Sequence, residues 1–291
     1  MMIMNSVFRI VITASLSVAI LFAENASSSD PKFVDAEVVE FDSVSYTYKP
    51  SPFKVKQAKK LGKTVEVKIE PSVSITGYLA RPQGVEPRPA IVLLHGCAGI
   101  SEFAEMWSDR LVSWGYIVFT VDSFTPRGHD YLCDGEKVTS WNRALDAYGA
   151  KRLLSTRSFV DSARIAVMGM SHGGMTVLEA IKLSISEGLA MEPFQAAIAF
   201  YPWCKEPKPI NTPTLILAGG KDDWFPAEFC VQYVNRLKSH HDITLKVFAD
   251  AYHGFDLTGL DIVEGGYTVR YNAEAAAEAS KLSREFLEEK L

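Results

Sequence analysis

A serine stands between a predicted strand and a predicted helix, in a spacing that suits nucleophilic catalysis. Ser171 is the central residue of Gly169-Met170-Ser171-His172-Gly173, which fits G-x-S-x-G and follows the strand-like run Arg164 to Met168. Such a turn strains the backbone of the serine and leaves no room for side chains at the flanking glycines. The alternative is an ordinary N-cap serine at a glycine-rich helix start. The strand before it and the helix after it favour a nucleophile.

A serine hydroxyl is a poor nucleophile at neutral pH, so this chemistry needs a base and an acid that orients the base. Asp222 follows the predicted buried strand Thr214 to Leu217, and His253 follows the next strand, Thr244 to Phe248. Catalytic groups of open α/β sheets gather at such strand ends. The chain order of serine, acid and histidine is also the order found in α/β-hydrolases. We therefore predict a triad of Ser171, Asp222 and His253.

Other residues compete for the acid and base roles. Asp223 lies next to Asp222, but the spacing to Pro226 favours Asp222. Asp223 is better suited to capping the helix that starts at Pro226. Among the histidines, His172 is adjacent to the serine in sequence, and we expect its side chain to point elsewhere.

Catalysis by such a serine also requires hydrogen-bond donors for the negatively charged oxygen of a tetrahedral intermediate. The backbone N–H of His172, just after the serine, is one candidate. Cys97 offers a second N–H from the loop His95 to Gly99, which follows the apolar run Ala90 to Leu94. The Cys97 thiol is an alternative nucleophile, but no strand-to-helix turn presents it.

The elements that must position these residues follow an α/β pattern. From residue 89 onward, apolar runs typical of strands buried on both faces alternate with helix-like stretches. The predicted strands are Ala90 to Leu94, Tyr116 to Val121, Ile165 to Met168, Ala196 to Phe200, Thr214 to Leu217 and Thr244 to Phe248. The predicted helices are Phe103 to Ser113, Trp141 to Ser155, Gly173 to Ser186, Ala227 to Lys238 and Asn272 to Lys290. We therefore expect an α/β-hydrolase fold with a mostly parallel, doubly wound sheet and helices on both faces.

The segment before residue 89 has a different pattern. Apolar and polar residues alternate from Thr64 to Ile69, which predicts a half-exposed strand, and Ser74 to Ala80 is its predicted hairpin partner. These would be antiparallel strands at the N-terminal edge of the sheet. No internal repeat or second domain is evident, so we predict a single domain over residues 27–291.

Together these motifs resemble the dienelactone hydrolase family. The matching pieces are Leu93 to Gly99, Asp122 to Gly128, the Ser171 turn, Asp222 with Pro226 and Cys230, and Tyr252 to Phe255. The resemblance implies an α/β-hydrolase that acts on ester or lactone bonds without a cofactor, with Asp222 and His253 in the triad. Founding members of the family carry a cysteine nucleophile where this chain has Ser171. Dienelactone is therefore not predicted as the substrate.

Arg127, in the matching segment Asp122 to Gly128, resembles a loop element of the family and has two interpretations. Its planar guanidinium is suited to binding a substrate carboxylate. It is equally suited to a structural ion pair that ties the loop near Asp122 to the sheet. The sequence leaves both interpretations open.

The start of the chain indicates export. Arg9 precedes the apolar stretch Val11 to Ala23 and a polar run, which predicts a signal peptide over residues 1–26 and a periplasmic or secreted protein. In an oxidising compartment the four cysteines can pair. Cys204 follows one predicted strand and Cys230 lies early in the helix after the next, so we favour this pair. The alternative is four buried free thiols.

The composition is typical of a globular protein with a small-molecule partner. The 291 residues are 47% apolar and 22% charged, and the net charge of -5 includes no long basic run. Neither nucleic acid nor, after leader removal, a stable membrane partner is expected. Metal-dependent hydrolysis is not predicted, because the six histidines lack paired ligand spacing such as H-E-x-x-H. The leading hypothesis is hydrolysis of a small ester or lactone. The alternatives are a peptidase, an acyltransferase or a non-catalytic binding protein of this fold.

Overall fold

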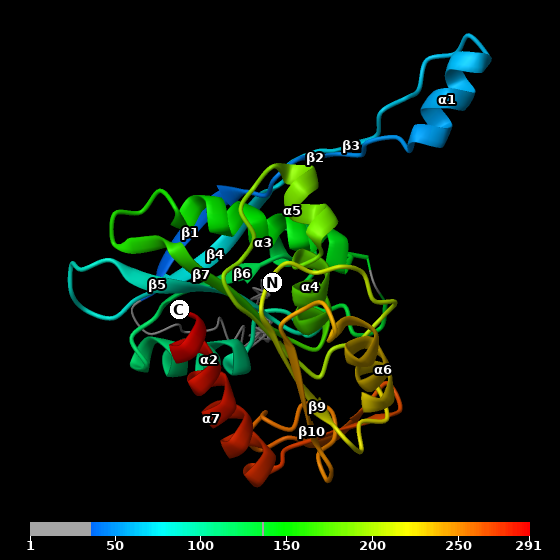
Figure 1. Cartoon of the computed structure of the whole chain (residues 1–291). Coiled ribbons are helices and arrows are strands. Elements are labelled where there is room, and N and C mark those ends of the chain that lie inside the picture. The colour runs from blue at the N-terminus through cyan, green and yellow to red at the C-terminus, as the bar shows by residue number, and fades with distance from the viewer. Residues whose placement is uncertain (1–35, 136) are drawn as a thin grey trace, which may run out of the picture. The chain divides into compact units, whose positions relative to one another are not determined.

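An eight-stranded sheet with the order β1-β4-β6-β5-β7-β8-β9-β10 organises the structure (Figure 1). The computed structural model describes residues 36–135 and 137–291. Neighbouring strands from β6 to β10 in this order run parallel, whereas β1 and β4 are antiparallel and lie at one edge. The strands are β1 (Glu37–Asp42), β4 (Ser74–Ala80), β5 (Arg88–Leu94), β6 (Ile117–Asp122), β7 (Val160–Met170), β8 (Ala197–Phe200), β9 (Thr214–Gly219) and β10 (Ile243–Phe248). The predicted α/β-hydrolase sheet with antiparallel N-terminal edge strands is confirmed.

Helices cover both faces of this sheet, which explains the continuous apolar sequences of its central strands. Every residue of β6 and β9 is buried. Helices α3 and α4 lie on one face of the sheet, and α2 and α7 lie on the other (Figure 1). Side chains of α3, α4 and α6 belong to one apolar cluster with the sheet, and side chains of α2 and α7 belong to another. The helices are α2 (Glu102–Ser113), α3 (Ser140–Leu154), α4 (His172–Ala180), α5 (Leu183–Leu189), α6 (Ala227–Leu237) and α7 (Ala273–Lys290).

Local sequence fixes how α3 begins and how closely it packs on the sheet. Thr139 and Asn142 form a capping box at its N-terminus. Gly149 lies in the middle of the helix, where glycine is normally unfavourable. A Cβ at this position would lie 2.4 Å from the carbonyl oxygen of Asp42 in β1, so the close approach of helix and strand requires glycine.

The hairpin predicted between residues 64–69 and β4 is wrong. β4 pairs with β1. The predicted partner contributes only its last residue to a short strand, β3 (Ile69–Glu70), which pairs with β2 (Tyr46–Thr47). Burial explains the difference, because Val39 of β1 is 8% exposed whereas Val67 is 49% exposed. Alternation in residues 64–69 therefore did not mark a strand on the core.

The helix predicted from Gly173 to Ser186 is two helices, α4 and α5. The chain leaves the helical conformation at Lys182, whose backbone is extended. Leu183 N–H then donates to the carbonyl oxygen of Pro209, 2.9 Å away, instead of continuing the helical ladder. The break occurs because this segment binds a neighbouring loop.

A second hairpin, β11 (Asp261–Glu264) and β12 (Tyr267–Arg270), was not predicted. Its turn residues Gly265 and Gly266 have φ values of 57° and 92°, which favour glycine. A Gly-Gly pair between two short strand-like runs is a recognised hairpin signal, so the sequence did contain this information.

Strands β2 and β3 lead to an unpredicted helix, α1 (Pro52–Lys60), which projects from the sheet in Figure 1. Ser51 caps it and Pro52 begins it, as is usual at helix starts. None of its residues is buried.

The predicted signal peptide, residues 1–26, lies outside the described residues. Within residues 36–135 and 137–291, no helix has the length and apolar character needed to span a bilayer.

Candidate active site

Ser171 occupies a strained turn between β7 and α4. Its φ is 52° and its ψ is -114°, a conformation that residues with a side chain rarely adopt. A Cβ at Gly169 would lie 2.5 Å from the backbone of Gly173, and a Cβ at Gly173 would lie 2.1 Å from the carbonyl oxygen of Leu94. The sharp turn expected from the glycine spacing is therefore present, and it places the serine at the N-terminus of α4, where negative charge is favoured.

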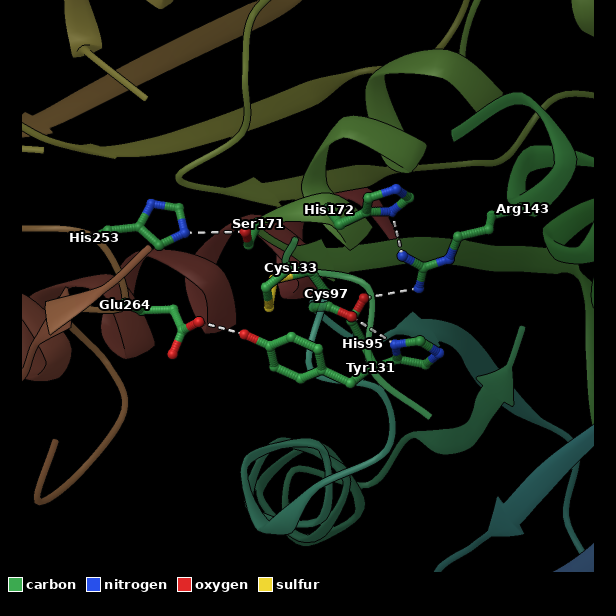
Figure 2. The surroundings of a disulfide bond; sticks show 10 residues. His95, Cys97, Tyr131, Cys133, Arg143, Ser171, His172, His253 and Glu264 are labelled. Carbon is green, nitrogen blue, oxygen red and sulfur yellow. Dashed lines mark hydrogen bonds between the residues drawn. A yellow bond between two sulfur atoms is a disulfide. The ribbon is translucent and has the colours of Figure 1, made fainter. Parts of the chain in front are cut away.

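The three residues predicted as a triad form one hydrogen-bonded chain. Ser171 Oγ lies 2.9 Å from His253 Nε2, and His253 Nδ1 lies 2.8 Å from Asp222 Oδ2 (Figure 2 shows the serine and the histidine). With the Nδ1 proton donated to the carboxylate, Nε2 can accept the proton of the serine. All three side chains are buried.

Hydrogen bonds to both carboxylate oxygens fix the position of Asp222. Oδ1 accepts hydrogen bonds from the N–H groups of Trp224 and Phe225, at 3.0 and 2.8 Å, while Oδ2 faces the histidine. Asp223 points elsewhere and accepts hydrogen bonds from the N–H and the hydroxyl of Thr268 in β12. The expectation that Asp223 caps the next helix is therefore wrong, because its carboxylate binds the β11–β12 hairpin.

A buried polar network that was not predicted from the sequence packs against the ring of His253. The ring of Tyr201 packs against that of His253 with the centroids 4.7 Å apart. Tyr201 donates its hydroxyl proton to Asp256, and Trp107 donates its indole N–H to the same carboxylate, at 2.7 and 2.6 Å. Burial raises the pKa of Asp256. The only sequence signal was the position of Asp256 three residues after His253.

A buried arginine connects the two segments on the other side of Ser171. Arg143 of α3 donates one hydrogen bond to the carbonyl oxygen of His95, at 2.7 Å, and another nitrogen lies 2.6 Å from His172 Nδ1 (Figure 2). Burial lowers the pKa of Arg143 to about 9, so its guanidinium stays charged at neutral pH. Burial, with the nearby Arg143 charge, also holds the pKa of His95 well below its usual range. No sequence pattern distinguished Arg143 from other helix arginines.

Both predicted oxyanion donors belong to the segments that Arg143 connects. His172 is the first residue of α4, directly after Ser171. Cys97 follows Gly96, and a Cβ on Gly96 would lie 3.9 Å from the Cβ of Ser171. The side chain of His172 points to Arg143, as expected, rather than to the serine.

All four cysteines are paired. The favoured pair Cys204–Cys230 is confirmed, and Cys97 is bonded to Cys133. Disulfide formation removes the Cys97 thiol as an alternative nucleophile. It also ties the loop after β5 to the loop that carries Tyr131.

Arg127 does not face Ser171. Its guanidinium forms two hydrogen bonds of 2.8 Å with the buried carboxylate of Asp146 in α3, and a third of 2.7 Å with the carbonyl oxygen of Ser123. The predicted role in substrate binding is therefore corrected, because these groups engage the planar fork of the guanidinium. Arg127 holds its loop against α3.

Ser171 opens into a pocket of about 150 Å³ with mainly apolar walls. The Cys97–Cys133 disulfide lies on one side of it. At the rim, the hydroxyl of Tyr131 donates a hydrogen bond to the carboxylate of Glu264, at the end of β11 (Figure 2). The apolar wall residues include Phe103, Ala104, Leu257, Leu260, Ile262 and Val269.

The chain is similar in sequence to known hydrolases. The family model described as the dienelactone hydrolase family matches residues 75–291. A probable 2-oxo-3-(5-oxofuran-2-ylidene)propanoate lactonase of Bradyrhizobium sp is 22% identical over 200 residues, which cover 61% of this chain and 77% of that protein. A bis(hydroxyethyl) terephthalate hydrolase of Streptomyces coelicolor is 32% identical over 145 residues, or 47% of this chain and 41% of that protein. The match thus spans less than half of the second relative.

A solved structure shares the fold over most of the chain. The dienelactone hydrolase-like promiscuous phosphotriesterase from metagenomic libraries superposes with a TM-score of 0.64, covering 88% of this chain and 98% of that one. The sequence identity is 18%, so this likeness concerns the fold alone.

Proposed function

Because the chain belongs to the dienelactone hydrolase family, we propose that it is a serine hydrolase that cleaves a carboxylic ester or lactone bond through an acyl-enzyme on Ser171. The hydrogen-bonded chain from Ser171 through His253 to Asp222 carries the proposal. It combines a nucleophile, a base and an orienting acid, and the nucleophile and the base line an apolar pocket.

In the proposed reaction, Ser171 Oγ forms a bond to the ester carbonyl carbon while its proton passes to His253 Nε2. Asp222 holds the imidazole and stabilises its positive charge. The backbone N–H groups of Cys97 and His172 are the proposed donors to the oxyanion. When the intermediate collapses, the alcohol leaves with the proton from His253. Water then repeats these steps on the acyl-enzyme, releasing the carboxylic acid and restoring the serine.

The size of the pocket supports small substrates. A cavity of about 150 Å³ is large enough for one benzene ring. A short acyl chain or a single aromatic ring therefore fits beside Ser171, whereas a long acyl chain would extend beyond the pocket. The relative from Streptomyces coelicolor acts on a terephthalate ester, which is consistent with a single-ring substrate.

The proposal includes export to the periplasm or the medium as a single mature domain of residues 27–291, after removal of residues 1–26. Two disulfides support it, because protein disulfides persist in oxidising compartments.

The test is hydrolysis of p-nitrophenyl esters of increasing acyl length by the purified protein and by Ser171→Ala. We expect turnover that is fastest for short acyl groups and absent from the variant. A fluorophosphonate probe should label the wild type at Ser171, which peptide mass spectrometry would locate. Absence of both turnover and labelling would contradict the proposal and favour a binding protein. Labelling with cleavage of peptides, but not of esters, would favour a peptidase.

A further inference from the structure

The carboxylate of Glu264 lines the rim of the pocket. Glu264 ends β11, and its carboxylate accepts the hydrogen bond from Tyr131. Tyr131 lies two residues before Cys133, whose disulfide holds this loop against Cys97. The carboxylate is therefore held at the pocket by two independent connections, the hairpin on one side and the cross-linked loop on the other (Figure 2).

The hydrogen bond leaves the negative charge on the glutamate. Bonding to Glu264 raises the pKa of Tyr131 to about 12, so the phenol stays a neutral donor. Burial and the charges of Glu264 and Asp134 also raise the pKa of Tyr131.

The described residues of the pocket wall include no lysine or arginine that could balance this charge. Among the residues that the structure describes, the pocket lining includes two histidines, His95 and His253, but no lysine or arginine. His95 is buried with its pKa well below the usual range, so it is neutral. Arg127, which the sequence suggested could bind a substrate carboxylate, is bonded to Asp146 and does not line the pocket.

We propose that Glu264 makes the enzyme selective for uncharged esters by repelling substrates that carry a carboxylate. This proposal rests on the hydrolase function proposed above and names its substrate class. A substrate carboxylate that enters the apolar pocket loses its hydration. It is also repelled by the Glu264 carboxylate, whose charge no lysine or arginine of the described pocket lining neutralises. The curated relative from Bradyrhizobium sp acts on a propanoate lactone, and the proposal predicts that this chain discriminates against such anions.

The test compares two rigid methyl esters of the same shape, methyl 4-carbamoylbenzoate and methyl 4-carboxybenzoate, which differ in one negative charge. The measured quantity is the ratio of kcat/KM for the neutral ester to kcat/KM for the anionic ester. In Glu264→Gln, whose amide oxygen still accepts the Tyr131 bond, we expect this ratio to fall about three- to tenfold. Raising the salt concentration should lower the ratio in the wild type and have less effect in the variant.

Two control variants test whether the change in the ratio comes from the charge of Glu264 rather than from altered packing at the rim or from the net charge of the protein. Tyr131→Phe removes the hydrogen bond but keeps the carboxylate, so the ratio should not fall. Glu187→Gln makes the same charge change at an exposed position of α5, and the ratio should equal that of the wild type. An unchanged ratio in Glu264→Gln, or an equal fall in Glu187→Gln, would overturn the proposal.

Binding tests the same inference without turnover. In Ser171→Ala the Kd of each ester can be measured, and adding Glu264→Gln should tighten binding of the anionic ester relative to the neutral one. If no ester is hydrolysed by the wild type, the hydrolase function fails, while the Kd ratio still decides the role of Glu264.

Discussion

The residues around Ser171 and the residues at the pocket rim are held in different ways. Ser171, Asp222 and His253 are 8%, 5% and 3% exposed, and they lie in the segments that follow β7, β9 and β10 of the central sheet. Tyr131 is 41% exposed and is connected to Glu264 by one side-chain hydrogen bond between a loop and the end of β11. Bond-breaking groups are thus fixed by the sheet, while the groups proposed to select the substrate lie where sequence can change at little cost to the fold.

The largest expected effect is a loss of kcat on replacing Asp222, which replacing its neighbour Asp223 should not cause. Asp222→Asn should lower kcat about 10³- to 10⁴-fold, because the amide no longer favours the histidine tautomer that accepts the serine proton. Asp223→Asn is the matched control, since Asp223 binds Thr268 and not His253. Steady-state kinetics on a p-nitrophenyl ester would measure both. A larger loss in Asp223→Asn would show that the acid was assigned to the wrong residue.

A smaller effect is expected when Arg143, which connects the segments of the two proposed oxyanion donors, is replaced. Arg143→Lys keeps a positive charge but cannot reach both His95 and His172, so kcat should fall about tenfold with KM little changed. Lys151→Gln, on the same helix, loses hydrogen bonds to the carbonyl oxygens of Glu192 and Pro193, which lie outside the site. It should lower Tm and leave kcat unchanged. Equal losses of kcat in both variants would mean that Arg143 acts only through stability.

The two disulfides can be compared because Cys97–Cys133 lines the pocket and Cys204–Cys230 does not. They close segments of 36 and 26 residues, so removing either one by paired alanine substitution should destabilise the protein by about 3–4 kcal/mol. Only loss of Cys97–Cys133 should also lower kcat, by about fivefold, because it loosens the loop of a proposed oxyanion donor. Denaturant unfolding and kinetics at a temperature where both variants are folded would measure this. A similar kcat in the two variants would contradict it.

The smallest effect is expected at the rim itself. Tyr131→Phe removes a partly exposed hydrogen bond, which should change the free energy of unfolding by less than about 1 kcal/mol. KM for a neutral ester should change by no more than about twofold, since the apolar wall remains. A loss of kcat comparable to that of Arg143→Lys would show that the rim takes part in positioning the reacting groups.

The structure could be predicted from the sequence where a local pattern determines the geometry. The glycines around Ser171 predicted the strained turn, and the apolar runs predicted the central strands, because burial on both faces admits few other residues. The edge strand was predicted wrongly, because the alternation in residues 64–69 resembles that of β1 although Val67 is exposed. Arg143 and Asp256 escaped prediction because their roles depend on which distant segments the sheet brings beside them. Arg127 shows the same limit, as its partner Asp146 lies on another element.

The arm formed by β2, α1 and β3 offers a place to attach the enzyme to a solid support. None of the residues of α1 is buried, and none of them lines the pocket. Gly62, just after the helix, has no atom within 4 Å of the place that a side chain would occupy. Inserted segments are tolerated where the backbone is exposed and packs against nothing. A peptide tag for covalent capture would therefore go beside Gly62, and the immobilised protein would keep its pocket open to solution.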